Sequence, residues 1–399
     1  MKIPISQPLF GPEELRAVQE PLESGWVVQG PKVKAFEDQF AAFIDTRFAA
    51  ATTSCTTALH LAMVALGVKP GDEVLVPAFT WVATPNVVEY MGATPIFCDI
   101  DLTTFNIDVK KVESLITPKT VGLLPVHLFG LCADMDPLIR LAQKHHLWIV
   151  EDAACAFGGQ YRGRHAGTFG KMGCFSFHPR KSITTGEGGM VTTTEPELDL
   201  MVRSLRDHGA TRSDLSRHQE TGGFLLPEYP HVGYNYRMTD IQGALGCAQM
   251  ARASSILERR AALARRYDQK LAAFPWLKSP SVPEGYVHGY QAYVCLFRPE
   301  EPTLRSVKSF NVARNALMAD LEANEIATRP GTHAPVLLEY YREKYRLRPE
   351  HFPNAFIADQ LSLALPLFPQ LSEENLDRIC GALEQAYLRF NKLQNQGHR

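Results

Sequence analysis

The chain has 399 residues, 45% of them hydrophobic, and a formal net charge of −2. This length provides a large core and fits two domains, and the balanced charge argues against a nucleic-acid-binding surface. The first residues contain no apolar run typical of a signal peptide, no window approaches a membrane span, and the eight cysteines show no CxxC or metal-ligand spacing. We therefore expect a reduced, cytoplasmic protein without a bound metal.

Strand and helix patterns alternate between about residues 50 and 195. Amphipathic stretches at 57–66 and 135–145 are typical of helices. Short apolar runs predict strands at 73–77, 94–99, 121–127, 147–151, 173–177 and 189–193. Such alternation indicates an α/β fold with a mostly parallel sheet covered by helices, in which ligands bind at the carboxyl ends of the strands.

The second half of the chain has a different pattern. A single long helix is expected over 240–273, followed by a strand at 292–297 and helices at 311–324 and 372–390. We predict a large domain over 1–250 and a smaller C-terminal α+β domain over 251–399. The stretch 208–233 is rich in Gly and Pro, and a long loop of this kind within a compact domain is often functional.

Lys181 follows an apolar strand and a polar turn in the segment Phe175-Ser-Phe-His-Pro-Arg-Lys, and the Gly-rich segment Gly186-Glu-Gly-Gly comes after it. A lysine at such a turn can point its amine into the cleft at the sheet end. A surface lysine is the ordinary alternative. The functional interpretation requires a partner in the same cleft that needs an amine.

Asp152 supplies such a partner. It ends the buried strand Leu147-Trp-Ile-Val-Glu-Asp, and a carboxylate there can keep a pyridinium nitrogen protonated. Pyridoxal phosphate (PLP) sites pair a Schiff-base lysine with such a group. The alternative, that Asp152 only caps the next turn, is equally compatible with the sequence.

Two further segments fit a PLP site. Thr53, Ser54, Thr56 and Thr57 crowd the start of a predicted helix, whose free N–H groups and dipole favour a phosphate. Simple helix capping is the alternative, although four hydroxyls exceed what a cap requires. Trp81, or its neighbour Phe79, follows a strand and could stack on a flat ring, although core packing is the more common role.

Taken together, the segments resemble the DegT/DnrJ/EryC1/StrS sugar aminotransferases, which are fold-type I PLP enzymes. The resemblance extends from Gly11-Pro-Glu-Glu through Ser24-Gly-Trp to Ala364-Leu-Pro-Leu-Phe. Its strongest marks are Glu151-Asp-Ala-Ala, the segment around Lys181, and Gly233-Tyr-Asn-Tyr-Arg-Met-Thr-Asp.

This resemblance implies roles for the matching residues. Lys181 would form the Schiff base and act as general acid and base, which suits a lysine whose pKa is lowered by neighbours and desolvation. Asp152 would pair with the ring nitrogen, and Trp81 would stack on the ring. The remaining cofactor contacts would come from Ser54, Cys55, Thr56, Cys155 and Ser176, and from Asn235 of a neighbouring subunit in a homodimer. Cys55 stands where Gly is usual and Cys155 where His or Gln is usual, so their contacts need not follow the family pattern.

The expected reaction is a two-stage exchange in which glutamate forms pyridoxamine phosphate and the keto-sugar then takes the amine. Gly186-Glu-Gly-Gly resembles members that aminate C4 of a nucleotide-linked 4-keto-6-deoxy sugar, whereas members acting at C3 more often carry Gly-Asp-Gly. Arg329-Pro-Gly-Thr-His-Ala resembles perosamine-synthase-like members and favours a GDP-sugar, with UDP- and dTDP-sugars open. Candidate substrate contacts are Trp26, His178, Glu187, Arg329 and His333. The product could enter O-antigen, capsule, a protein glycan or an antibiotic.

Three other classes compete with this interpretation. A sugar dehydratase of the same superfamily would replace the lysine by histidine, and Lys181 argues against it. A fold-type I aminotransferase acting on free amino acids remains open. A PLP-binding regulator is disfavoured because no DNA-binding domain or basic stripe is evident and both Lys181 and Asp152 are intact.

Overall fold

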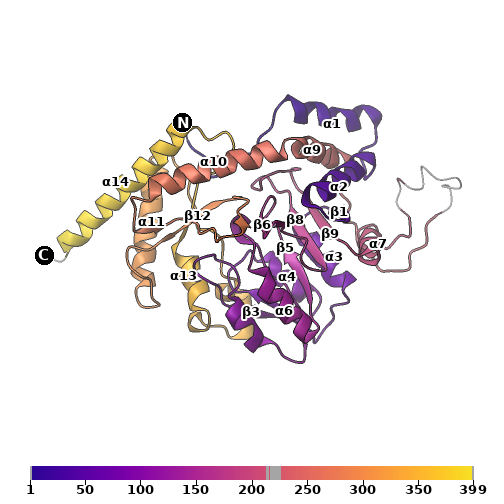
Figure 1. Ribbon diagram of the computed structural model, residues 1–399, viewed down its shortest axis with the longest axis horizontal. Helices are drawn as coiled ribbons and strands as arrows, with labels where there is room; N and C mark the ends of the chain where they lie inside the picture. The colour runs from indigo at the N-terminus through magenta and orange to yellow at the C-terminus, as the bar shows by residue number, and fades with distance from the viewer. Residues whose placement is uncertain (1, 213–214, 216–225, 398–399) are drawn as a thin grey trace.

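A computed structural model describes residues 2–212, 215 and 226–397 (Figure 1). Its centre is a seven-stranded sheet in the order β1-β9-β8-β5-β4-β2-β3. The pairs from β8 to β3 are all parallel, and β9 runs antiparallel to both of its neighbours. The strands are β1 (Phe48–Thr52), β2 (Glu73–Pro77), β3 (Thr94–Cys98), β4 (Thr120–Leu123), β5 (Trp148–Asp152), β8 (Met172–Ser176) and β9 (Gly189–Thr193).

Helices cover both faces of this sheet because successive side chains of each strand point to opposite faces. In β2, Val74 and Val76 belong to one buried cluster and Leu75 to the other. The helices of this part are α1 (Pro12–Ser24), α2 (Pro31–Ile44), α3 (Cys55–Ala65), α4 (Ala83–Tyr90), α5 (Val109–Val112), α6 (Met135–His145), α7 (Pro196–Leu205) and α9 (Asp240–Ala251). The predicted α/β fold with a mostly parallel, two-sided sheet is therefore confirmed.

A second, smaller sheet with the order β10-β12-β13 lies in the C-terminal part, where α11 and α14 pack on each other. The long helix α10 leads from the central sheet toward this part (Figure 1). The elements of the C-terminal part are α10 (Ala253–Leu271), β10 (Leu277–Lys278), β12 (Tyr293–Phe297), α11 (Val307–Ala323), α12 (Glu339–Tyr345), α13 (Pro353–Leu361), β13 (Ser362–Leu365) and α14 (Glu373–Gly397). A third small sheet joins β6 (Gln160–Tyr161), β7 (Arg164–His165) and β11 (Tyr286–Val287). The domain boundary near residue 250 stays a prediction.

The single helix predicted over 240–273 is wrong. The chain forms α9 and α10, which meet at Arg252, whose φ of −107° and ψ of 1° leave the helical range. The Arg252 guanidinium reaches back to Glu14 of α1 at 3.0 Å. The helical periodicity continues across the break, so only these contacts between distant segments reveal it.

One strand of the sheet was missed, and one predicted strand is shorter than expected. β1 was not predicted. The run 121–127 is a regular strand only as far as Leu123, and Pro125, which has no N–H to donate, lies in the irregular part that follows. That part still follows β5, since Pro125 O accepts from Asp152 N at 2.9 Å and His127 N donates to Asp152 O at 3.0 Å.

Residues 213–214 and 216–225 of the predicted functional loop lie outside the described residues. All eight cysteines are free thiols. Within the described ranges, no helix has both the length and the apolar character needed to cross a lipid bilayer.

Candidate active site

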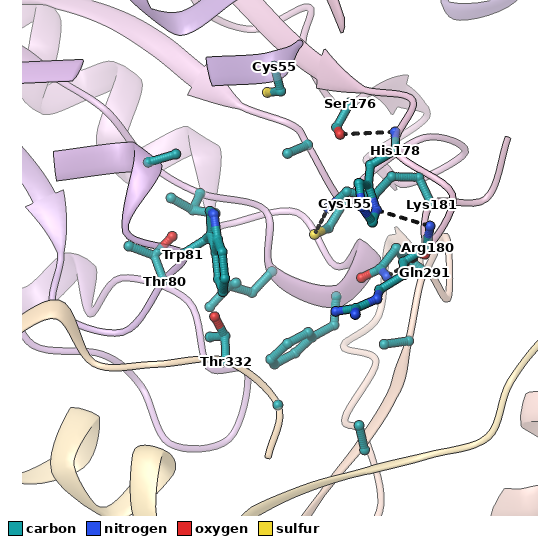
Figure 2. A pocket seen from close by; sticks show the side chains of 18 of the residues that line it. Cys55, Thr80, Trp81, Cys155, Ser176, His178, Arg180, Lys181, Gln291 and Thr332 are labelled. Carbon is teal, nitrogen blue, oxygen red and sulfur yellow. Dashed lines mark hydrogen bonds between the residues drawn. The ribbon is translucent and has the colours of Figure 1, made fainter. Parts of the chain in front are cut away.

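A cavity of about 480 Å³ opens at the carboxyl ends of β5 and β8, beside the start of α3. It gathers residues from distant parts of the chain, as Figure 2 shows. The predicted site residues that line it are Ser54, Cys55, Thr56, Trp81, Asp152, Cys155, Ser176, His178, Lys181, Glu187, Arg329 and His333. A topology in which parallel strands end at one edge accounts for this convergence.

Lys181 lies in the turn between β8 and β9, where its backbone N–H donates to the His178 carbonyl at 2.8 Å. Its Nζ donates to Cys155 Sγ at 3.1 Å, drawn as a dashed line in Figure 2. Burial lowers the pKa of Lys181, but Cys155, Cys55 and Asp152 reverse this, so the pKa is raised. The expectation of a lowered lysine pKa is therefore wrong for this arrangement, because the neighbouring thiols and carboxylate favour the charged amine.

Asp152 ends β5 and is buried. Its Oδ2 accepts from Thr84 Oγ1 at 2.8 Å, and its Oδ1 accepts from the Ala154 N–H at 3.2 Å. Burial raises the pKa of this carboxyl, and these hydrogen bonds together with Lys181 oppose the rise. The bond to Ala154 is the turn-capping role considered from the sequence, but Asp152 also faces the cavity and the charge of Lys181, as the functional interpretation requires.

The adjacent carboxylate, Glu151, has a different environment. It is fully buried and accepts hydrogen bonds from the backbone N–H groups of Gly167, Phe169 and Gly170 at 2.6–2.7 Å. His127 Nε2 lies 2.8 Å from the same carboxylate. Of the two carboxylates that end this strand, Glu151 therefore anchors β5 to the following loop, and only Asp152 lines the cavity.

The start of α3 provides a cradle for an anion. Ser54 caps the helix, accepting from the Thr57 N–H at 3.1 Å, and the hydroxyls of Thr53 and Thr57 lie 3.1 Å apart. The hydroxyls of Thr53, Ser54 and Thr57 thus serve the helix cap. For Ser54 this favours helix capping over phosphate binding. The first-turn N–H groups of a helix have no intrahelical acceptor, and those of Cys55 and Thr56 lie at the cavity together with the Thr56 and Ser176 side chains.

The cavity is also lined by an exposed indole and two arginines, with Trp81 and Arg180 on different sides of it in Figure 2. The Trp81 ring is 59% exposed and lies 5.8 Å from the His333 ring. The Arg180 and Arg329 side chains also line the cavity. Burial and the charge of Arg180 both lower the pKa of Arg329. The positive charge of Arg180 therefore repels that of Arg329.

Two predicted site residues lie away from this cavity. Trp26 is half-buried over Gly30, with its ring N–H donating to the Gln29 carbonyl at 3.4 Å. Asn235 is exposed and forms an isolated backbone bridge with Asp207. Neither residue lines the cavity of its own chain.

Sequence reasoning missed several residues that the fold brings to the site: Thr80, Thr84, Arg180, Gln291 and Thr332. Thr84 holds Asp152, and Gln291 donates to the Arg180 carbonyl at 2.8 Å. Thr80 precedes α4 and Thr84 lies in its first turn, and their hydroxyls lie 3.0 Å apart. Gln291 gave no signal of its own, since it lies about a hundred residues beyond Lys181 in the sequence.

These residues fit PLP. An amine and a buried carboxylate share the cavity, an exposed indole lies beside them, and a helix N-terminus with hydroxyls can hold a phosphate. The α/β sheet and this site define a PLP-dependent enzyme of fold type I.

Comparisons with known proteins identify the family. The model of the DegT/DnrJ/EryC1/StrS aminotransferase family matches residues 8–384. The spore coat polysaccharide biosynthesis protein SpsC of Bacillus subtilis is 38% identical over 383 residues, 96% of each chain. The chain belongs to this family and is a PLP-dependent sugar aminotransferase.

Solved structures agree with this. The putative sugar aminotransferase Spr1654 of Streptococcus pneumoniae in its PMP form is 30% identical with a TM-score of 0.89, covering 97% of this chain and 100% of that chain. DesV of S. venezuelae is 33% identical with a TM-score of 0.85, covering 96% and 98%.

Proposed function

We propose that the protein transfers the amino group of glutamate to C4 of a nucleotide-linked 4-keto-6-deoxy sugar. The observation that carries this proposal is that Arg329 and His333, from the perosamine-synthase-like segment, line the same cavity as Lys181 and Asp152. The product would serve surface polysaccharide or another glycoconjugate, as the name of SpsC suggests for that relative.

Bound PLP supplies the electron sink, and the chain supplies orientation and proton transfer. Asp152 would keep the ring nitrogen protonated, and Trp81 would stack on the ring. Thr56, Ser176 and the first-turn N–H groups of α3 would hold the phosphate. The Lys181 amine takes a proton from the α-carbon of the donor and later delivers one to C4 of the acceptor.

The acceptor is bound on the side of Arg329 and His333. Arg180 and Arg329 have no carboxylate partner among the described ion pairs, so the phosphates of a sugar nucleotide suit them. His178 and Glu187 also line the cavity and would contact the sugar. Trp26 would contribute only if a second subunit brought it to the cavity.

The proposal is tested by product analysis. The pyridoxamine phosphate form is mixed with a panel of GDP-, UDP- and dTDP-linked 4-keto sugars, and mass spectrometry and NMR identify the products. We expect nitrogen at C4. Nitrogen at C3 would overturn the positional assignment alone. A PLP-binding regulator would not convert glutamate to 2-oxoglutarate, and an enzyme for free amino acids would leave every sugar unchanged.

We further propose that two subunits of a homodimer share each site, with Asn235 contributed across the interface. Support comes from the exposure of Asn235 and from its absence from the cavity lining of its own chain. A two-fold interface is isologous, so each subunit would give its Asn235 to the other.

Mixed dimers test this sharing. Lys181→Ala and Asn235→Leu proteins should each be nearly inactive. In a heterodimer with shared sites both lesions fall on one site, and the other site is intact. Co-refolding should therefore restore activity, up to one working site per heterodimer. Heterodimers that stay at the level of the parents would show that Asn235 acts within its own subunit or only structurally.

A further inference from the structure

Cys155 and Lys181 form a thiol–amine pair inside the cavity. Cys155 Sγ lies 3.1 Å from Lys181 Nζ, and both residues line the 480 Å³ space. Cys155 is half-buried, in the loop that follows β5. Small molecules that enter the cavity can therefore reach the sulfur.

We propose that Cys155 is a peroxide-sensitive modification site whose sulfenic acid closes onto Nζ of Lys181 to form a reversible sulfenamide cross-link. The oxidant is a small peroxide such as hydrogen peroxide, which the open cavity admits. The cross-link depends only on this pair of side chains. Its consequence for activity rests on the proposed role of Lys181.

The chemistry balances in two steps. The Cys155 thiolate attacks peroxide, the O–O bond breaks, and sulfenic acid and hydroxide form. The hydroxide takes a proton from the neighbouring Lys181 ammonium and leaves as water. The unprotonated Lys181 amine then attacks the sulfur, the S–O bond breaks, and a second water leaves as the S–N bond forms. Two equivalents of a thiol reverse the reaction, giving back the Cys155 thiol and the Lys181 amine with one disulfide. The protein loses two hydrogen atoms in the cross-linked state.

The surroundings favour Cys155 over the other cysteines. Cys155 is half-buried and lines the open cavity, where a small peroxide can reach its sulfur beside the Lys181 amine. Six of the other thiols are buried. The remaining one, Cys247, is half-buried, but burial raises its pKa to about 11, which suppresses the reactive thiolate.

Oxidation also prepares the amine for attack. Cys155 is the first of the neighbours that raise the pKa of Lys181, and burial lowers that pKa. Converting the thiolate to neutral sulfenic acid removes the first of these raising influences, while those of Cys55 and Asp152 remain. The pKa of Lys181 therefore falls, and the unprotonated amine becomes more populated. The flexible four-carbon chain of lysine permits the remaining approach from 3.1 Å to bonding distance.

The cross-link would occupy the amine that anchors the cofactor. A protein carrying pyridoxamine phosphate has a free Lys181 amine and should be sensitive to peroxide. A protein carrying PLP on Lys181 should be protected. Peroxide would thus inactivate the enzyme reversibly during only one half of its cycle.

The test uses the full-length protein loaded with pyridoxamine phosphate, treated with hydrogen peroxide and digested with trypsin without reducing agent. The main Cys155 product should join the peptides 145–162 and 181–203 at a mass lower by two hydrogen atoms. Dithiothreitol should release both peptides. Loading with PLP should suppress the joined product, and equal cross-linking of both forms would instead count against Lys181 as the cofactor anchor while supporting the pair.

Variants separate the possible causes. Cys155→Ser should abolish the joined peptides, and Lys181→Arg should leave a sulfenic acid that a 1,3-dione probe captures. Cys247→Ser is the matched control and should cross-link like the wild type. A disulfide between Cys55 and Cys155, or oxidation of Cys155 to sulfinic acid without any joined peptide, would overturn the inference.

Discussion

Replacing Lys181 by alanine is expected to remove the visible absorbance of lysine-bound PLP and to lower transamination at least about 10²- to 10⁴-fold, the usual contribution of one positioned acid–base group. Lys181 is the only lysine among the described residues that line the cavity. No other cavity-lining side chain offers an amine for the cofactor or for the proton transfers. Absorbance spectra and the production of 2-oxoglutarate from glutamate measure both effects.

Lys171→Ala is the matched control. Lys171 immediately precedes β8 at the end of the strand remote from the cavity, and its half-exposed side chain pairs with Glu195 at 2.5 Å. Such a surface pair contributes little, so spectrum and turnover should stay unchanged. A Lys181→Ala protein with the wild-type spectrum would refute the assignment of the anchor.

Asp152→Asn is expected to retain some PLP but to transaminate roughly 10- to 100-fold more slowly. A neutral amide cannot hold the ring nitrogen protonated, and the lost charge-assisted hydrogen bond is worth roughly 1.5–3 kcal/mol if felt in the transition state. Single-turnover rates with glutamate, measured at saturating PLP, give the change in the chemical step. Turnover near the wild-type value would mean that Asp152 serves only as a turn residue.

The thermal stability of the Asp152→Asn protein tells a catalytic role of Asp152 from a structural one. Burial raises the pKa of Asp152, so the folded state holds the ionised carboxylate less well than the unfolded chain does. The contribution of this group to stability is therefore lost as pH rises through its pKa, and at neutral pH the charge opposes folding. Asparagine keeps an acceptor for Thr84. The melting temperature of the cofactor-free Asp152→Asn protein should consequently not fall at neutral pH.

The sequence by itself determined the class of fold, and it singled out two residues, Asp152 and Lys181, that the fold brings to one cavity. Short apolar runs marked β2, β5, β8 and β9, because buried strands of a two-sided sheet need continuous apolar side chains. Polar residues at the ends of those runs marked Asp152 and Lys181, because parallel strands bring their carboxyl ends to one edge. These features are local, so they can be read along the chain.

Tertiary structure alone decided the contacts between segments that are distant in the sequence. Thr84 holds Asp152 across 68 residues, and Cys155 meets Lys181 across 26. The break at Arg252 goes with its contact to Glu14, 238 residues earlier. The raised pKa of Lys181 depends on which thiols and carboxylates surround it. Electrostatics and packing depend on distances in space, which local propensity and periodicity do not encode.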